Sequence, residues 1–501
     1  MMPFDWFTIA PAMPEIFLAC AAMGLLMVGV FSRAEVAARS VSGLAIAAFA
    51  VTYVLMHAAK AGEFQHAFPK GAVGFMFIAD DFAFYAKTLI LAAAGFSMVL
   101  ATDFLSRKGI NKFEYYVLMT LATLGMMVMV SANDLLSMYV GLELMSFSLY
   151  ILAAFWRDNL KSSEAGLKYF VLGSLASGMM LYGMSLLYGM TGDTSFEGIA
   201  LVLANGLPSQ GHDVAVTVAL VFLLVAMAFK VSAVPFHMWT PDVYEGAPTP
   251  VTAFMATAPK VAAMLLLIRV LYQPLMVLED QWMQILTFLS IVTMGLGSLM
   301  AIVQTNLKRL LAYSSIGNVG FMLVGVVAGG TQGIQGVLMY LAIYLVMTIG
   351  LFGVLLSLRR KDVFVEELTD LAGLSRIAPG AAFAMMIIVF SLAGVPPLVG
   401  FFAKFYVFSA AVGAGLTWLA VLGVLFSVIA AYYCLRIVKV MYFDEGKFRP
   451  EVSRPSHAHW VLCAAAVGVI VLSVFIDRLD AVTEKAAGSL LSMEQTFAPK
   501  H

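Results

Sequence analysis

The chain has 501 residues, of which 62% are hydrophobic and only 12% are charged. A soluble domain is about half apolar and a quarter charged. The composition therefore excludes a soluble globular protein and indicates a polytopic membrane protein. The formal net charge of −1 excludes a basic surface for nucleic acid. The three cysteines are far apart and form no Cys-x-x-Cys pair, which argues against an iron–sulfur site or a disulfide framework.

Fourteen stretches are apolar over about 20 residues, the length that an α-helix needs to cross a bilayer. They predict an all-α polytopic fold with about 14 transmembrane helices, roughly at 11–31, 40–58, 78–102, 114–132, 135–155, 165–190, 214–240, 249–272, 282–304, 309–329, 333–358, 380–411, 415–442 and 459–477. A cleaved signal peptide requires a basic segment before its apolar stretch. The first stretch of this chain has no such segment. We therefore expect it to be a membrane helix.

Lysine and arginine are distributed unevenly between the two sides of this arrangement. The loops after odd-numbered helices hold sixteen, namely Arg33, Arg39, Arg107, Lys108, Lys112, Arg157, Lys161, Lys308, Arg309, Arg359, Arg360, Lys361, Arg376, Lys447, Arg449 and Arg454. The opposite side holds five, namely Lys60, Lys70, Arg478, Lys485 and Lys500. Because basic loops stay in the cytoplasm, the sequence predicts cytoplasmic odd loops and two termini on the periplasmic side.

Two predicted helices, 214–240 and 380–411, are overlong and contain proline. Proline removes a backbone donor and breaks a helix, and the freed carbonyls need partners in protein or water. The sequence FKVSAVP at 229–235 matches FSLAGVP at 390–396. The two helices are five apart, so they run in opposite directions. This pattern predicts two inverted five-helix repeats, each with a proline-broken helix, which is typical of transporters.

The predicted helices divide the chain into four parts without a large soluble domain. These are an N-terminal three-helix segment at 1–112, a first repeat at 113–273, an inverted second repeat at 281–443, and a C-terminal helix and tail at 458–501. The longest loops are expected at about 193–213 and 443–458.

Four ionisable residues lie well inside apolar segments: Glu143, Lys230, Lys260 and Lys404. A charge at that depth costs about 3 kcal/mol on insertion scales, and this cost indicates a functional role. In a purely structural alternative, Glu143 forms a static ion pair with one lysine, which leaves two lysines unexplained. Other charges near helix ends are expected to reach the membrane surface, namely Lys87, Arg269, Arg436 and Lys439.

The same residues suit proton transfer. Burial favours the neutral form of a lysine, and a nearby carboxylate favours the charged form, so Glu143 beside Lys230 could switch it. Lys260 and Lys404 would extend the series of titratable groups along the midplane of the bilayer, bridged by water. His237 follows Pro235 and titrates near neutrality. Alternatively, His237 binds a freed carbonyl. A hard metal ion would need several carboxylates, so we expect no metal site.

Two longer runs carry a specific resemblance. The first is KVSAVPFHMW at 230–239 with PD at 241–242, EGAPTPV at 245–251 and Lys260, and the second is LLAYSSIG at 310–317. Together they resemble the signatures of the antiporter-like membrane subunits of respiratory complex I, the NADH–quinone oxidoreductase. The resemblance covers roughly residues 114–442. It departs at Asn318, where the family often has a histidine, and asparagine cannot titrate.

The resemblance implies a role for each buried residue. Glu143 and Lys230 would be the buried pair, Lys260 the central relay lysine and Lys404 the lysine on the release side. It also implies a subunit of a proton-translocating enzyme in the bacterial inner membrane, with other membrane-arm subunits, both antiporter-like and small, as partners. The chain has no Walker A loop and no G-x-G-x-x-G after a strand. NADH, FMN, iron–sulfur clusters and quinone are therefore expected on partner subunits.

Three alternatives remain open from the sequence. Mrp-type Na⁺/H⁺ antiporters and hydrogenase- or ferredoxin-linked membrane complexes share these signatures. In the third alternative the chain is a passive structural subunit. That alternative predicts that neutral replacements of the buried lysines leave proton translocation unchanged.

Overall fold

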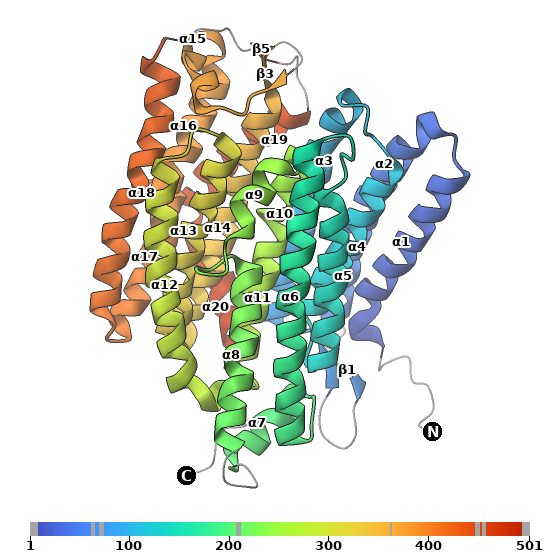
Figure 1. Ribbon diagram of the computed structural model, residues 1–501, viewed down its shortest axis with the longest axis vertical. Helices are drawn as coiled ribbons and strands as arrows, with labels where there is room; N and C mark the ends of the chain where they lie inside the picture. The colour runs from blue at the N-terminus through green and yellow to red at the C-terminus, as the bar shows by residue number, and fades with distance from the viewer. Residues whose placement is uncertain are drawn as a thin grey trace.

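The computed structural model describes residues 9–61, 66–69, 75–206, 212–360, 363–445, 451–452 and 457–492. Within these residues, helices carry almost all of the regular structure (Figure 1). The α-helices are α1 Met13–Phe31, α2 Ala34–Ala61, α3 Asp81–Arg107, α4 Phe113–Val130, α5 Leu135–Ala153, α6 Leu160–Thr191, α7 Phe196–Ala204, α8 His212–Val231, α9 Trp239–Gly246, α10 Thr249–Met255, α11 Ala258–Tyr272, α12 Glu279–Ile302, α13 Leu307–Ala328, α14 Gly330–Ser357, α15 Leu374–Ile377, α16 Pro379–Ala393, α17 Val399–Gly413, α18 Thr417–Phe443, α19 His457–Val474 and α20 Ile476–Ser492.

Short strands occur only in connections of the described chain. A hairpin joins β1 His66–Pro69 to β2 Phe75–Ile78, and a small sheet has the order β4 Val363–Phe364, β3 Leu358–Arg360, β5 Glu451–Val452. Three short 3-10 helices lie at Ala10–Ala12, Met276–Leu278 and Leu368–Leu371.

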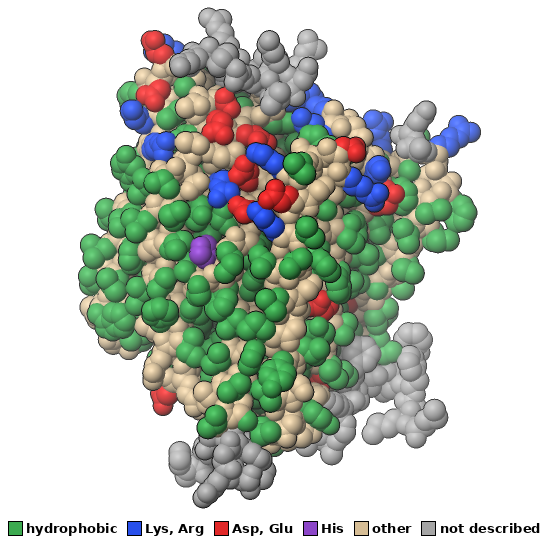
Figure 2. Space-filling model, in the orientation of Figure 1, with side chains coloured by type: hydrophobic (Ala, Val, Ile, Leu, Met, Phe, Trp, Pro, Cys, Tyr) green, Lys and Arg blue, Asp and Glu red, His purple; other side chains and the backbone are tan. Residues whose placement is uncertain are grey.

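Thirteen helical segments of the described chain are long and apolar enough to span a membrane. The shorter apolar helices α16 and α17 together occupy the predicted span at 380–411. The prediction of an all-α polytopic membrane fold is confirmed. In Figure 2 a wide band of apolar side chains surrounds the middle of the visible face, while Lys and Arg gather toward the end that carries α9 and α15.

The structure corrects several predicted boundaries. Helix α8 ends at Val231, four residues before Pro235. The predicted helix 249–272 is interrupted at Ala256 and Thr257, where α10 ends and α11 begins. The expected loop at 193–213 contains α7. Most of the expected loop at 443–458 lies outside the described residues, as do Lys70, Lys361, Lys447, Arg449, Arg454 and Lys500.

Glycines allow the closest helix contacts in both halves of the molecule. A Cβ on Gly125 of α4 would lie 2.5 Å from the backbone nitrogen of Met145 on α5. A Cβ on Gly297 of α12 would lie 2.4 Å from the backbone nitrogen of Gly317 on α13. Small residues at such contacts are the usual way in which membrane helices pack closely. The pairs α4–α5 and α12–α13 are accordingly the most extensive helix contacts in the fold.

The helices of the predicted first repeat (the first set, α4 to α11) and those of the predicted second repeat (the second set, α12 to α18) pack in the same order. In the first set, α6 packs against both parts of the broken helix, α8 and α9. In the second set, α14 packs against both α16 and α17. Helix α13 of the second set also packs against α9 of the first. Figure 1 shows α8 to α11 in the centre, with α1 at one edge and α18 at the other.

The C-terminal helix α20 was not predicted, because its many polar residues keep it below the hydropathy of a membrane span. It packs against α14 and α3. Lys485 forms an ion pair with Asp81 at 3.3 Å, and Gln335 donates to Asp480 at 2.7 Å. Helix α20 therefore connects the N-terminal segment to the second set of helices.

Candidate functional site

The first helix break exposes backbone carbonyls beside a lysine from another helix. After Val231, Ser232 adopts a left-handed conformation with φ 68°, which ends the helix. Trp239 Nε1 donates to the Phe229 carbonyl at 3.0 Å. Lys260 Nζ, from α11, donates to the Val231 carbonyl at 3.0 Å. A cation is favourable at this position because a helix C-terminus carries partial negative charge.

The second break has the same construction. Helix α16 ends at Ala393, and Gly394 adopts the left-handed conformation with φ 88°. Lys404 Nζ, from α17, donates to the Ala393 carbonyl at 2.9 Å and to Ser427 Oγ at 2.8 Å. Its ammonium group also lies 5.2 Å from the centre of the Phe321 ring. Each break therefore presents its last helical carbonyl to a buried lysine.

The structural correspondence is offset by one residue from the sequence match. Aligning the motifs at 229–235 and 390–396 places Ser232 opposite Ala393. In the structure, however, the residue in the left-handed conformation is Ser232 at the first break and Gly394 at the second. Lys230 then corresponds to Leu392, and the second break lacks a lysine at this position. Among the buried lysines of the described chain, Lys260 and Lys404 are the pair with equivalent contacts at the two breaks.

Lys230 is buried in the last turn of α8 and contacts α5. Its Nζ donates to Ser146 Oγ at 2.8 Å and lies 3.5 Å from the Tyr150 hydroxyl. Glu143, one turn away on α5, interacts with Lys230 electrostatically but forms no ion pair with any lysine of the described chain. Its Oε1 is buried without a hydrogen-bond partner. The static ion pair of the structural alternative is therefore not formed.

His237 lies within the first break and is half-buried. His237 interacts with the backbone of Pro235, as the carbonyl-binding alternative predicts, and electrostatically with Lys260. No side-chain hydrogen bond connects it to Lys230 or Lys260 in the described chain. The geometry places His237 near the predicted series of residues but does not join it to them.

A network of hydroxyl groups surrounds α13, between the two breaks. Tyr340 donates to Asn318 Oδ1 at 2.7 Å, and Tyr344 donates to Ser315 Oγ at 2.8 Å. From α18, Tyr433 donates to Ser314 Oγ at 2.9 Å. Because α13 packs against both α9 and α17, this network lies between the second part of the first broken helix and the helix that carries Lys404.

Sequence reasoning missed these tyrosines. Buried tyrosines in an apolar helix look like ordinary core residues. The spacing of Tyr340 and Tyr344 on one helical face, together with the serines of the AYSSIG run, is the signal that could have revealed them.

Two basic residues that were predicted to lie at the membrane surface, Lys87 and Arg269, are instead buried, and each forms an ion pair with an acidic side chain. Arg269 is 0% exposed and binds Asp80 with Nη2 at 2.8 Å. Lys87 binds Glu15 at 2.7 Å, and both side chains are about 5% exposed or less. The prediction was wrong because each partner lies far away in the sequence. Lys439, by contrast, is exposed and pairs with Asp444 at 3.5 Å.

The acidic residues of the first signature form a charged cluster on α9. Asp242 binds Lys168 of α6 at 2.8 Å and Arg309 of α13 at 2.7 Å, and Glu245 binds Lys161 at 2.9 Å. Partial burial opposes ionisation of Asp242, but hydrogen bonds from Lys168 and Arg309 outweigh it and hold its pKa below the usual value. This cluster ties the end of the broken helix to both halves of the molecule.

No group of three or more His, Cys, Asp or Glu side chains in the described ranges could hold a metal ion. The chemistry that these residues offer is that of amines, hydroxyls and one carboxylate, which exchange protons.

Comparison with known proteins identifies the family. Residues 132–430 match the family model described as NADH:quinone oxidoreductase/Mrp antiporter, TM. NADH-quinone oxidoreductase subunit N of Paramagnetospirillum magneticum is 53% identical over 489 residues, which cover 96% of this chain and 98% of that protein. The chain belongs to the NADH-quinone oxidoreductase subunit N family. Subunit N of Rhodospirillum rubrum is also 53% identical, over 96% of this chain and 98% of that protein.

The solved structures agree with membership in the subunit N family. A chain of respiratory complex I from Thermus thermophilus with bound aureothin is 31% identical, with a TM-score of 0.78 over 94% of this chain and 99% of that chain. A chain of the Mrp complex from Dietzia sp. has a TM-score of 0.84 but is 22% identical, which shows the fold alone. The resemblance predicted from the sequence is confirmed.

Proposed function

We propose that this chain is a proton-translocating membrane-arm subunit of an NADH–quinone oxidoreductase in the bacterial inner membrane. Its subunit N relatives support the assembly. One observation carries the mechanism: the amines of Lys230, Lys260 and Lys404 are buried, and in the described chain they donate hydrogen bonds to hydroxyl and carbonyl oxygens and form no ion pair. Such amines can lose a proton without breaking a salt bridge.

Lys230 is the first residue of the proposed relay. It shares hydrogen bonds with Ser146 and Tyr150, which can orient either the ammonium or the neutral amine. Glu143 lies one turn away on α5 and interacts with Lys230 electrostatically, and a nearby carboxylate favours the charged form of an amine. A change in the charge of Glu143 would therefore make Lys230 release or take up a proton. We propose that this step couples the chain to redox energy.

Lys260 and Lys404 continue the relay. Each ammonium is stabilised by the last carbonyl of a broken helix, a contact that also orients the amine when it is neutral. The hydroxyl network on α13 offers polar partners for water between them. Protons would pass from Lys230 to Lys260 and then to Lys404. His237, at the half-buried break, is proposed as an accessory group that connects Lys260 to water.

The remaining assignments complete the proposal. The electron-transfer cofactors, NADH, FMN, iron–sulfur clusters and quinone, would lie on partner subunits, and neighbouring antiporter-like and small membrane subunits would contact this chain. We propose that both termini face the periplasm. We also propose that 113–273 and 281–443 are inverted repeats that follow an N-terminal segment at 1–112 and precede a C-terminal part at 458–501. The matched packing of α4–α5 and α12–α13 supports this division.

Replacing Lys230 with methionine tests the relay. The substitution keeps an apolar chain of similar length but removes the amine from Ser146 and Tyr150. In liposomes that contain the whole complex, proton uptake driven by NADH should be lost. Electron transfer from NADH to a soluble acceptor in the peripheral arm should remain near wild type. Lys439→Met, which removes an exposed lysine, is the matched control. Full proton uptake by Lys230→Met would refute the relay.

Purification of the complex through this chain distinguishes the alternatives. Flavin and iron–sulfur subunits in the purified complex support the proposal. Small antiporter subunits alone would indicate an Mrp-type antiporter, and a nickel–iron hydrogenase would indicate a hydrogenase-linked complex.

A further inference from the structure

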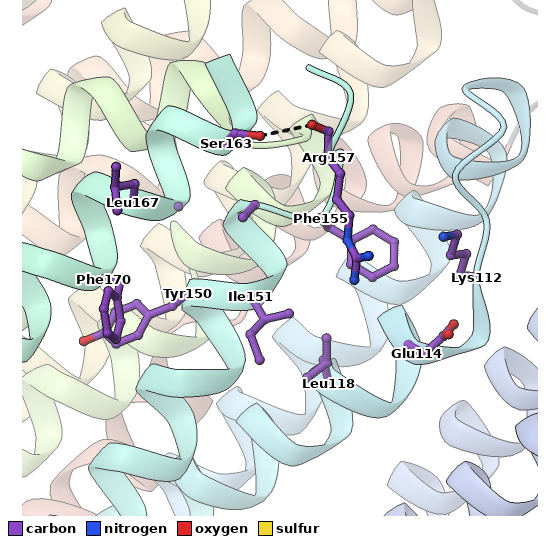
Figure 3. Close-up of a pocket in the computed structure, with 12 residues that line it drawn as sticks. Lys112, Glu114, Leu118, Tyr150, Ile151, Phe155, Arg157, Ser163, Leu167 and Phe170 are labelled. Carbon is purple, nitrogen blue, oxygen red and sulfur yellow. Dashed lines mark hydrogen bonds between the residues drawn. The ribbon is translucent and has the colours of Figure 1, made fainter. Parts of the chain in front are cut away.

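A groove opens at one end of the membrane-spanning bundle, between α4, α5 and α6 (Figure 3). Its volume is about 610 Å³. It lies where α4 begins, α5 ends and α6 begins, so its mouth is at the membrane surface. The walls below the mouth are apolar and partly exposed, and they include Leu118, Ile151, Leu167 and Phe170.

Three charged side chains lie at the mouth of the groove. The side chain of Arg157 runs down beside Phe155, and Lys112 and Glu114 lie across the opening from it (Figure 3). All three charged residues are exposed, and none has a hydrogen bond or ion pair from its side chain within the described chain. Elsewhere at this end, Lys161, Lys168 and Arg309 all pair with acids. The basic residues at the mouth therefore remain available to an outside ligand.

The groove is long enough for part of an acyl chain. Phe170 lies ten residues beyond the first residue of α6, which corresponds to about 15 Å along the helix. This distance is half of a hydrocarbon core of about 30 Å. The groove is closed at its deep end by Tyr150, which approaches Gly173 of α6 closely. An unbranched chain fits this shape.

We propose that this groove binds one phospholipid of the ethanolamine class. Lys112 and Arg157 would hold the phosphate, Glu114 would hold the primary ammonium, and an acyl chain would lie against Ile151, Leu167 and Phe170. Basic pockets between membrane helices suit phosphate headgroups in this way. Because the mouth holds one carboxylate, Glu114, beside two basic residues, it favours a headgroup with both a phosphate and an ammonium over a headgroup that carries only negative charge.

The lipid would also occupy the surface side of the relay. Tyr150 is both the floor of the groove and a neighbour of the Lys230 amine. An acyl chain in the groove therefore separates Lys230 from the water at this membrane surface. The lipid site itself does not depend on the proposed relay, because it rests on the groove and its charges.

The test uses the whole complex in nanodiscs with a phosphatidylethanolamine probe that carries a diazirine on its acyl chain. After illumination, peptides that contain Ile151, Leu167 or Phe170 should carry the label. Unlabelled phosphatidylethanolamine should compete, whereas diacylglycerol, which lacks the headgroup, should not. Equal competition by diacylglycerol would overturn the proposal, since the groove would then hold only surrounding lipid.

Variants locate the headgroup. The double variant Lys112→Gln and Arg157→Gln should need about 25 times more probe for half-maximal labelling, because each basic residue contributes about fivefold. Arg376→Gln, which removes an exposed arginine far from the groove in the chain, should label like wild type. Glu114→Gln should weaken the ethanolamine probe but not a phosphatidylglycerol probe.

A further variant blocks the apolar part of the groove. Leu167→Trp fills the space but keeps all three charges, and it should abolish labelling of the groove peptides. Unchanged labelling in this variant or in the double variant would refute the site. Assembly of each variant is checked by electron transfer from NADH to a soluble acceptor, and the competition experiment on wild type stands without any variant.

Discussion

The equivalent contacts of Lys260 and Lys404 lead to a test that separates stability from function. Lys260→Met keeps a buried chain of similar length and removes the amine from the Val231 carbonyl. Loss of a hydrogen bond to a charged group costs about 1.5–3 kcal/mol. Removal of a charge from the membrane interior relieves about 2.5–3.5 kcal/mol on insertion scales. The two effects nearly cancel, so the free energy of unfolding should change by about 1 kcal/mol or less.

Function should change much more than stability. The variant complex should assemble with near wild-type thermal stability, measured by dye-reported unfolding in detergent. Its proton uptake in liposomes, per NADH oxidised, should fall to background, because no other titratable side chain of the described residues donates a hydrogen bond to the Val231 carbonyl. Lys404→Met should behave in the same way, with the additional loss of the bond to Ser427.

Two outcomes would refute this reasoning. If Lys260→Met retains proton uptake, then the amine is not part of the relay. If the variant loses more than about 3 kcal/mol of stability, then the lysine acts mainly as a structural cap for α8, and the loss of uptake would follow from misfolding.

Three further predictions concern the surroundings of the relay. Gly173→Ala places a Cβ 2.1 Å from the Tyr150 hydroxyl, so the ring must move, and the rate of proton uptake should fall several-fold with assembly intact; an unchanged rate would contradict a role for this hydroxyl. Asp242 has a lowered pKa, so its ion pairs stabilise the fold at neutral pH and are lost as the pH falls through that value. Wild type and Asp242→Asn should therefore differ in unfolding temperature at pH 7, by the equivalent of about 1 kcal/mol or less, and converge in acid; a constant difference would argue against the ion pairs. Asp80→Asn keeps a helix cap but leaves Arg269 charged and buried, which should cost about 3–5 kcal/mol and lower the yield of assembled complex; an unchanged yield and unfolding temperature would show that Arg269 has another partner.

The breaks could be predicted from sequence because proline has a fixed chemical consequence. Pro235 lacks a backbone donor, and a helix in lipid cannot tolerate this loss without other partners. The end of α8 at Val231 could not be predicted, since it depends on the left-handed conformation of Ser232. The contact between Lys260 and Val231 joins residues 29 positions apart, and no local pattern encodes it.

The errors of the sequence-based interpretation have a common physical cause. Lys87 and Arg269 lie close enough to helix ends to suggest surface positions, but their partners Glu15 and Asp80 reach them through tertiary packing. The same limit hid the tyrosine network, because a hydroxyl is identified as a relay group only when its partner is known. The buried lysines were identified because charge in an apolar segment is costly wherever the chain folds.

Helix α20 has a consequence for how the molecule can move. Through Lys485 and Asp480 it fastens α3 to α14, elements from the beginning and the later part of the chain. A transporter that moves α3 relative to α14 in each cycle would have to break the ion pair of Lys485 or the hydrogen bond of Asp480. In this chain, α20 holds α3 and α14 together through these two contacts. We therefore expect α3 and α14 to move together, so that a proton path through this chain would rely on side-chain rotation and water rather than on movement of these two helices against each other.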